Sequence, residues 1–280
     1  MSLQNADFQL DCYGVDIVMQ FANPITSRSW LGYALRGMLG RSLFDSVCIN
    51  AQPRCEQCAL RNTCAYPQVF KPAELGAGVT RLPAYVVHDW SLDESRYSIR
   101  FSVLIFGTAV SYLEGWLQGL LRQNGELNLA GAKQGRIVKI SDFESSAPLM
   151  HGQRLMNTVS PIKITHSDTS HVVVKLQTLT ATKHIGDQFL FAALRTRLRR
   201  LLADYGQGDW RKENVGWVVQ KSDLKKYRVQ VNEKRQLNGV IGQLSLVDIH
   251  PDAFALLSLG QFTHVGRDCV AGLGRIRLIK

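Results

Sequence analysis

The sequence lacks five features that would point to common classes of protein. No apolar run approaches the roughly 20 residues that a membrane-spanning helix needs, and the first residues lack the basic-then-apolar order of a secretory signal. There is also no nucleotide-phosphate motif, no Ser-His-Asp order and no metal-hydrolase signature. We therefore expect a cytoplasmic protein without a membrane partner, and a small-molecule enzyme is the least favoured class.

Acidic residues are in the minority. The chain has 33 Lys and Arg against 23 Asp and Glu, which gives a formal net charge of +10. Residues 1–90 carry seven side chains of each sign, whereas residues 195–235 carry twelve basic and five acidic ones. Clustered Lys and Arg bind phosphate backbones by releasing counterions. The pattern favours a polyanionic partner, and a well-solvated surface is the alternative.

Apolar periodicity predicts two successive β-α-β-β-α-β patterns. Such a pair implies an α+β fold with two tandem ferredoxin-like (RRM-like) domains. We place the domains at residues 1–150 and 165–280, with the boundary in the Pro- and Gly-containing stretch 144–169. The expected strands are 8–21, 98–107, 136–143, 171–179, 215–220, 226–231, 239–247 and 275–279, and the expected helices are 109–122, 187–205, 251–260 and one around Leu31–Leu39.

Residues 46–90 interrupt the first pattern with cysteines, prolines and glycines, as an inserted, loop-rich finger would. Four cysteines there have the spacing C-x6-C-x2-C-x5-C, and four thiolates can hold a tetrahedral zinc ion. An iron–sulfur cluster and unligated buried thiols are the alternatives to a structural zinc. The candidate metal ligands are Cys48, Cys55, Cys58 and Cys64.

Two motifs in the second half favour contacts with phosphates. In the helix 187–205, leucines form a buried stripe and leave Arg195, Arg199 and Arg200 on the far side, with Arg197 on the flank. Near the carboxyl end, three glycines and three arginines precede the last strand, so that backbone N–H groups could face a phosphate while the arginines neutralise it. These loop residues are Gly266, Arg267, Gly272, Gly274, Arg275 and Arg277.

This combination resembles the CRISPR-associated RAMP endoribonucleases. Their last domain ends in a His-Val-Gly-x5-Gly-x-Gly loop, which matches residues 264–274, and a strand and a basic helix like residues 176–206 precede it. In the first half, the stretch Leu35-Arg36-Gly37-Met38-Leu39-Gly40, followed by the cysteines, looks like the version of the family with a cysteine finger. The arginine-rich composition is similar to the type IV (Csf) branch.

The resemblance implies an enzyme that binds a CRISPR repeat RNA hairpin and cleaves it without a catalytic metal. The ribose 2′-hydroxyl attacks the adjacent phosphate and yields a 2′,3′-cyclic phosphate and a 5′-hydroxyl. Many members place a histidine near the first helix, but this chain has none between Phe21 and Cys48. Arginine is a poor base but a good clamp for charge, so the expected catalytic residues are Arg28, Arg36, Arg41 and Arg267, and Tyr33 is expected to contact RNA.

Two other functions remain open. A chain of this fold without the histidine could hold a processed repeat hairpin as a non-catalytic subunit of a CRISPR effector complex, together with other effector subunits. Alternatively, the cysteine finger could bind nucleic acid or protein while the ferredoxin-like units act as scaffold. In the second case, affinity would depend on Cys55 and Cys58.

Overall fold

The computed structural model describes residues 8–27, 29–49, 54–76, 80–164, 169–181, 188–210, 215–232 and 235–279. Contacts divide the chain into two compact units. The N-terminal unit spans Asp11–Ile162, and the C-terminal unit spans Lys163–Lys280 and also takes in the start of the chain through Leu10. Residues 8–10 thus belong to the C-terminal unit, whereas the sequence grouped them with the first domain.

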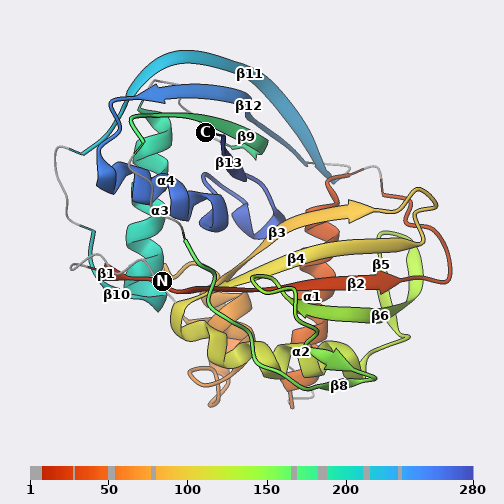
Figure 1. Ribbon diagram of the computed structural model, residues 1–280. Helices are drawn as coiled ribbons and strands as arrows, with labels where there is room; N and C mark the ends of the chain where they lie inside the picture. Colours follow the sequence, from red (N-terminus) through yellow and green to blue (C-terminus); the bar gives the residue numbers. More distant parts are fainter. Residues whose placement is uncertain are drawn as a thin grey trace. The chain divides into compact units, whose positions relative to one another are not determined.

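The N-terminal unit is built on an antiparallel sheet of five strands in the order β3-β4-β2-β6-β5. Helix α1 follows β2, and α2 follows β4, so the main elements run β-α-β-β-α-β along the chain (Figure 1). A short hairpin, β7–β8, lies near the end of the unit. The bounds are β2 Cys12–Gln20, α1 Leu31–Val47, β3 Tyr85–Leu92, β4 Ser98–Phe106, α2 Leu113–Arg122, β5 Leu127–Leu129, β6 Ala132–Asp142, β7 Met150–His151 and β8 Arg154–Leu155.

Aromatic rings fill much of the space between this sheet and its helices. Phe70 stacks on Tyr85 with 5.0 Å between ring centroids, and Trp116 meets Tyr85 edge-on at 5.4 Å. The indole of Trp116 also donates a 3.3 Å hydrogen bond to the carbonyl of Leu39, which ties α2 to α1. These contacts anchor α1, the helix that carries two of the expected catalytic arginines.

The C-terminal unit repeats the same arrangement with a sheet of order β11-β12-β9-β13, again antiparallel throughout. Helices α3 and α4 lie together below the sheet in Figure 1. Strand β1 from the start of the chain pairs with β10 just after α3. The bounds are β1 Phe8–Gln9, β9 His171–Thr180, α3 Phe189–Tyr205, β10 Gln207–Gly208, β11 Val218–Asn232, β12 Arg235–Val247, α4 Pro251–Thr263 and β13 Ile276–Ile279.

The predicted fold class is confirmed, because each unit has the β-α-β-β-α-β order of a ferredoxin-like domain. Some predicted elements were wrong in detail. The two short strands at 215–220 and 226–231 are one strand, β11, with a bulge between Val219 and Lys221. The helix predicted at 109–122 begins with a 3₁₀ turn, Gly107–Tyr112, and only then becomes α-helical.

The segment predicted as a finger at 46–90 is shorter than expected. Its first two residues end α1, and residues 85–90 form most of β3. Among the described residues between Cys48 and Ala84 there is no strand, and three short helices cover part of the segment. These are Cys55–Gln57, Tyr66–Phe70 and Pro72–Leu75.

Candidate RNA interface and cysteine pocket

Helix α3 presents three arginines on its exposed side, Arg195, Arg199 and Arg200. The Arg195 guanidinium lies 5.8 Å from the ring centre of Phe191, and Arg199 forms a 3.6 Å ion pair with Asp209. All three arginines line one shallow groove of about 540 Å³. As predicted, the opposite side of the helix is buried through Leu190, Leu194, Leu198 and Leu201.

Arg197 departs from the prediction that it contacts RNA. Its side chain is buried, and its Nε donates a hydrogen bond to the carbonyl of Thr263 at the end of α4. Burial raises the pKa of the nearby Cys269 thiol, and the Arg197 guanidinium partly opposes that rise. Arg197 therefore joins α3 to α4 inside the C-terminal unit.

Strand β11 carries basic residues that the sequence analysis did not single out. It is an edge strand of its sheet, and most of its side chains are exposed. The Arg228 Nε donates a 3.0 Å hydrogen bond to the side chain of Asn238 on β12, which holds this guanidinium along the hairpin. The excess of basic residues over 195–235 is the feature of the sequence from which the exposed cations of β11 could have been predicted. The exposed cations are Lys221, Lys225, Lys226 and Arg228.

The glycine-rich loop before β13 folds back on itself. The N–H of Val265 donates to the carbonyl of Gly274, and a Cβ atom at Gly274 would lie only 1.7 Å from the Val265 oxygen. Gly274 has φ +73°, and Gly266 and Gly272 also have positive φ. Gly266 and Gly274 are therefore required where one backbone closely approaches another, and Gly272 is favoured by its positive φ.

Most of this loop's N–H groups are used inside the protein, which corrects the expectation that they face a phosphate. His264, at the entry, is fully buried, and its Nδ1 lies 3.1 Å from the carbonyl of Leu273. The loop can reach an anion through the exposed side chain of Arg267, while Arg275 is half-buried; Arg277, predicted with the loop, is exposed on strand β13. Internal acceptors take the N–H groups of Val265, Arg267, Ala271, Gly272, Gly274 and Arg275.

On α1, Arg36 lies against the aromatic core of the N-terminal unit. Its guanidinium carbon is 5.6 Å from the ring centre of Phe70. Burial raises the pKa of the adjacent Tyr85 phenol, and the charge of Arg36 opposes that rise. Gly40, one turn further on, is buried, because the Phe70 ring occupies the place of a side chain there.

Arg41 lies on another side of α1, where it is exposed and lines a groove of about 560 Å³ with Gln123, Glu126 and Asn128. The structure therefore does not bring Arg36 and Arg41 to one point. Tyr33 is half-buried on the same helix. Arg28 lies outside the described residues, and Arg267 belongs to the C-terminal unit.

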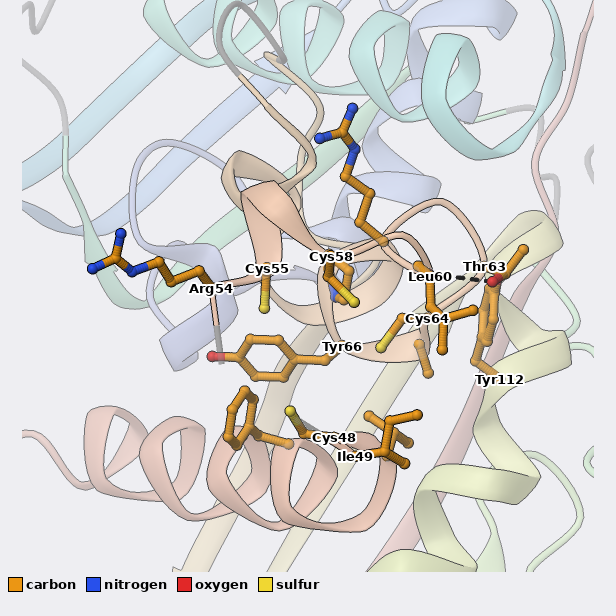
Figure 2. Close-up of a pocket in the computed structure, with 15 residues that line it drawn as sticks. Cys48, Ile49, Arg54, Cys55, Cys58, Leu60, Thr63, Cys64, Tyr66 and Tyr112 are labelled. Carbon is orange, nitrogen blue, oxygen red and sulfur yellow. Dashed lines mark hydrogen bonds between the residues drawn. The ribbon is translucent and has the colours of Figure 1, made fainter. Parts of the chain in front are cut away.

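The four predicted metal ligands line one pocket of about 370 Å³ in the N-terminal unit. Cys48 directly follows α1, and Cys55, Cys58 and Cys64 come from the segment after it; Figure 2 shows their sulfur atoms around a common space. All four are free thiols. Burial, followed by the neighbouring negative groups, raises the pKa of Cys55, and burial likewise raises that of Cys64. Within the described ranges, however, no three His, Cys, Asp or Glu side chains are placed closely enough to hold a metal ion as they stand.

Comparison with known proteins finds two family matches. Residues 10–163 match AF_1859_N, described as an N-terminal domain, and residues 157–276 match the CRISPR-associated endoribonuclease Cas6. A protein of Archaeoglobus fulgidus, described as uncharacterized, is 25% identical over 268 residues, which covers 89% of this chain and 91% of the relative.

Solved structures share the fold at low sequence identity. A Cas6 product complex superposes with a TM-score of 0.60 at 13% identity, covering 96% of this chain and 99% of that chain. Thermus thermophilus Cas6 gives 0.56 at 12% identity with the same coverage. A partial Cas6-RT-Cas1–Cas2 complex gives 0.58 at 14% identity and covers 96% of this chain and 46% of that one.

The chain belongs to the AF_1859_N domain family through its residues 10–163. Its two units have the fold of the solved Cas6 structures, and residues 157–276, which include the basic helix face and most of the glycine-rich loop region, match the Cas6 family. Among the described residues, no helix is both long enough and apolar enough to span a bilayer.

Proposed function

We propose that this protein binds a CRISPR repeat RNA hairpin and cleaves it to produce guide RNA. The observation that carries the proposal is the exposed arginine face of α3, which lies within the segment that matches Cas6. Three guanidinium groups around one groove suit the phosphates of a folded RNA better than a small ligand. The basic edge strand β11 adds four exposed cations to the same unit.

In the proposed reaction the RNA supplies its own nucleophile. The 2′-oxygen bonds to the adjacent phosphorus, the bond from phosphorus to the 5′-oxygen breaks, and the leaving oxygen takes up a proton. The products are a 2′,3′-cyclic phosphate and a 5′-hydroxyl. Because the attack is internal to the RNA, the reaction needs no catalytic metal, and the protein has to align the two oxygens and stabilise charge on the phosphate.

Of the two expected catalytic residues on α1, Arg41 is the one that an RNA phosphate could reach, although Asp45 and Glu126 line the same groove. Arg41 is exposed and borders this groove, whereas Arg36 is held over Phe70 and serves to position α1. Arg28 and Arg267 remain proposed catalytic residues. Since α1 contains no histidine, electrostatic stabilisation has a larger share of the proposed catalysis than proton transfer by a base.

The test uses labelled repeat RNA and excess EDTA, beside the same RNA with a 2′-deoxy residue at the cut. We expect the first RNA to be cleaved and the second to bind but stay intact. Under single-turnover conditions, Arg41→Ala should slow cleavage by about 10²-fold with little change in binding, and Arg41→Lys should recover part of the rate.

Arg122→Ala is the matched control, because Arg122 is exposed at the end of the other helix of the same unit. It should leave the rate unchanged. An equal loss of rate in the control, or cleavage of the 2′-deoxy RNA, would contradict the proposal.

The absence of a histidine from α1 favours a second candidate function, a non-catalytic subunit that holds the repeat hairpin. Tight binding of both RNAs without cleavage would support it. In either role, the protein is proposed to stay bound to its RNA with other CRISPR effector subunits in the cytoplasm. The type IV branch remains a prediction from the arginine-rich composition.

A further inference from the structure

We infer that Cys48, Cys55, Cys58 and Cys64 form a structural zinc site that fixes the segment 54–70 to the end of α1. The four cysteines converge on one place in the structure. The four thiols come from positions up to 16 residues apart, yet all line a single pocket. Figure 2 shows the sulfur atoms on different sides of that pocket, as ligands surrounding an ion would be.

The side chains that line the cysteine pocket also favour zinc. Apart from the thiols, the described residues of the wall are mainly apolar or aromatic and include no carboxylate or imidazole. A set of four sulfur ligands without oxygen or nitrogen selects zinc, or an iron–sulfur cluster, over hard cations such as magnesium and calcium. Phe44, Tyr66 and Tyr112 form the aromatic part of this lining, and each is half-buried.

The charge of a zinc–thiolate site has positive side chains beside it. A zinc ion with four thiolates carries a net charge of about −2, which would be costly to bury without compensation. Arg54 and Arg61 both line this pocket and bring two positive charges to its rim, where Arg54 is exposed and Arg61 donates a hydrogen bond to the carbonyl of Glu56.

The sulfur atoms must still move together, because a zinc site needs each of them at about 2.3 Å from the ion. The segment that carries three of the sulfur atoms can move toward the ion at little cost in free energy. Its backbone hydrogen bonds are local turns, such as Cys58 N–H to the carbonyl of Cys55 and Cys64 N–H to that of Leu60. No strand pairing in the described part of the segment opposes the movement.

Binding would stabilise a contact that reaches the proposed RNA-cleaving helix. Two residues after Cys64, Tyr66 meets Phe44 of α1 with ring centroids 5.0 Å apart. Phe70 then packs over Gly40 and Arg36. A metal that holds Cys64 to Cys48 therefore keeps Tyr66 and Phe70 packed on α1, and the role of the metal is structural.

The experiment measures the metal content of the full-length protein purified from zinc-supplemented cells. We expect about one zinc per chain, retained during a short incubation in EDTA, because a site of four thiolates is tight. Cys58→Ser should lose the zinc and lower the melting temperature. Cys269→Ser is the matched control: that cysteine is buried in the C-terminal unit, and a hydroxyl can keep its hydrogen bond to the carbonyl of Gly266.

A second measurement covers the case in which Cys58→Ser does not fold. Wild-type protein stripped of metal is titrated with Co²⁺, and the absorption bands of tetrahedral cobalt thiolate are followed to an endpoint near one equivalent. Metal-free wild-type protein without cobalt–thiolate bands would overturn the inference, and so would stoichiometric iron and sulfide. RNA cleavage is not part of the readout, so this outcome is independent of the proposed function.

Discussion

At the residue scale, the four arginines of α3 have unlike roles. The run Arg195–Arg200 has helical spacing that places Arg197 beside the apolar stripe, and a helical wheel does not say whether such a flank is covered. Helix α4 covers it, so Arg197 donates to Thr263 while Arg199 reaches outward to Asp209. A scan of single arginines must therefore separate loss of folding from loss of RNA binding.

The glycine-rich loop gives the sharpest prediction at this scale. Gly274→Ala should lower the free energy of unfolding by about 3 kcal/mol or more, because the new methyl group would overlap the Val265 carbonyl and φ is +73°. Denaturant unfolding of the full chain is the measurement. Gly115→Ala is the control, since Gly115 is on the exposed side of α2 with no atom within 4 Å of the added carbon.

The control should gain about 0.5–1 kcal/mol, because alanine is the better helix former. A stable Gly274→Ala protein that binds RNA poorly would contradict our interpretation of the loop, since it would mean that the glycine admits a phosphate and not a neighbouring carbonyl.

At the element scale, we expect the exposed arginines of α3 to contact RNA phosphates together. Replacing Arg195, Arg199 and Arg200 together with methionine keeps the length of the stems and removes three charges. We expect weaker repeat binding and a log–log salt dependence less steep by about three. Binding measured at several salt concentrations tests this expectation, and unfolding measured alongside should change little because all three side chains are exposed.

A charge-matched triple variant provides the comparison. Arg122, Arg136 and Arg154 are exposed in the N-terminal unit and are replaced in the same way. If this variant loses as much affinity and salt dependence as the α3 variant, then the interaction depends on net charge, and α3 has no special role.

The edge strand β11 shows how an element can be recognised from sequence while its exposed cations are overlooked. Its residues alternate poorly, so they were divided into two short strands. In the structure it is one long strand with few buried side chains. A long exposed edge would invite pairing with other chains, and its lysines oppose that pairing as well as attract phosphates.

At the scale of the whole molecule, the charge is divided unevenly between the two units. Taking the three α3 arginines and the four cations of β11 as phosphate contacts, affinity for repeat RNA should fall about 10³-fold between 50 and 200 mM salt. Titrations across this range check the value. A nearly salt-independent affinity would mean that stacking or shape, and not these cations, dominates the complex.

The sequence by itself determined the two repeated β-α-β-β-α-β patterns, the buried leucine stripe of α3 and the grouping of four cysteines. These follow from local periodicity and spacing, which residues close in the chain are enough to define. The predicted boundary within 144–169 likewise contains the point after Ile162 at which contacts divide the chain.

Only the tertiary structure decided which charged and small residues are accessible. Arg36 and Gly40 are covered by Phe70, thirty or more positions away in the sequence, and the loop N–H groups are taken up by carbonyls such as that of Leu179. Burial depends on which distant segment packs on a surface, and a helical period or a glycine count carries no information about that partner. For this reason the elements were predicted well, whereas the exposed side chains that form the candidate site became known only from the folded chain.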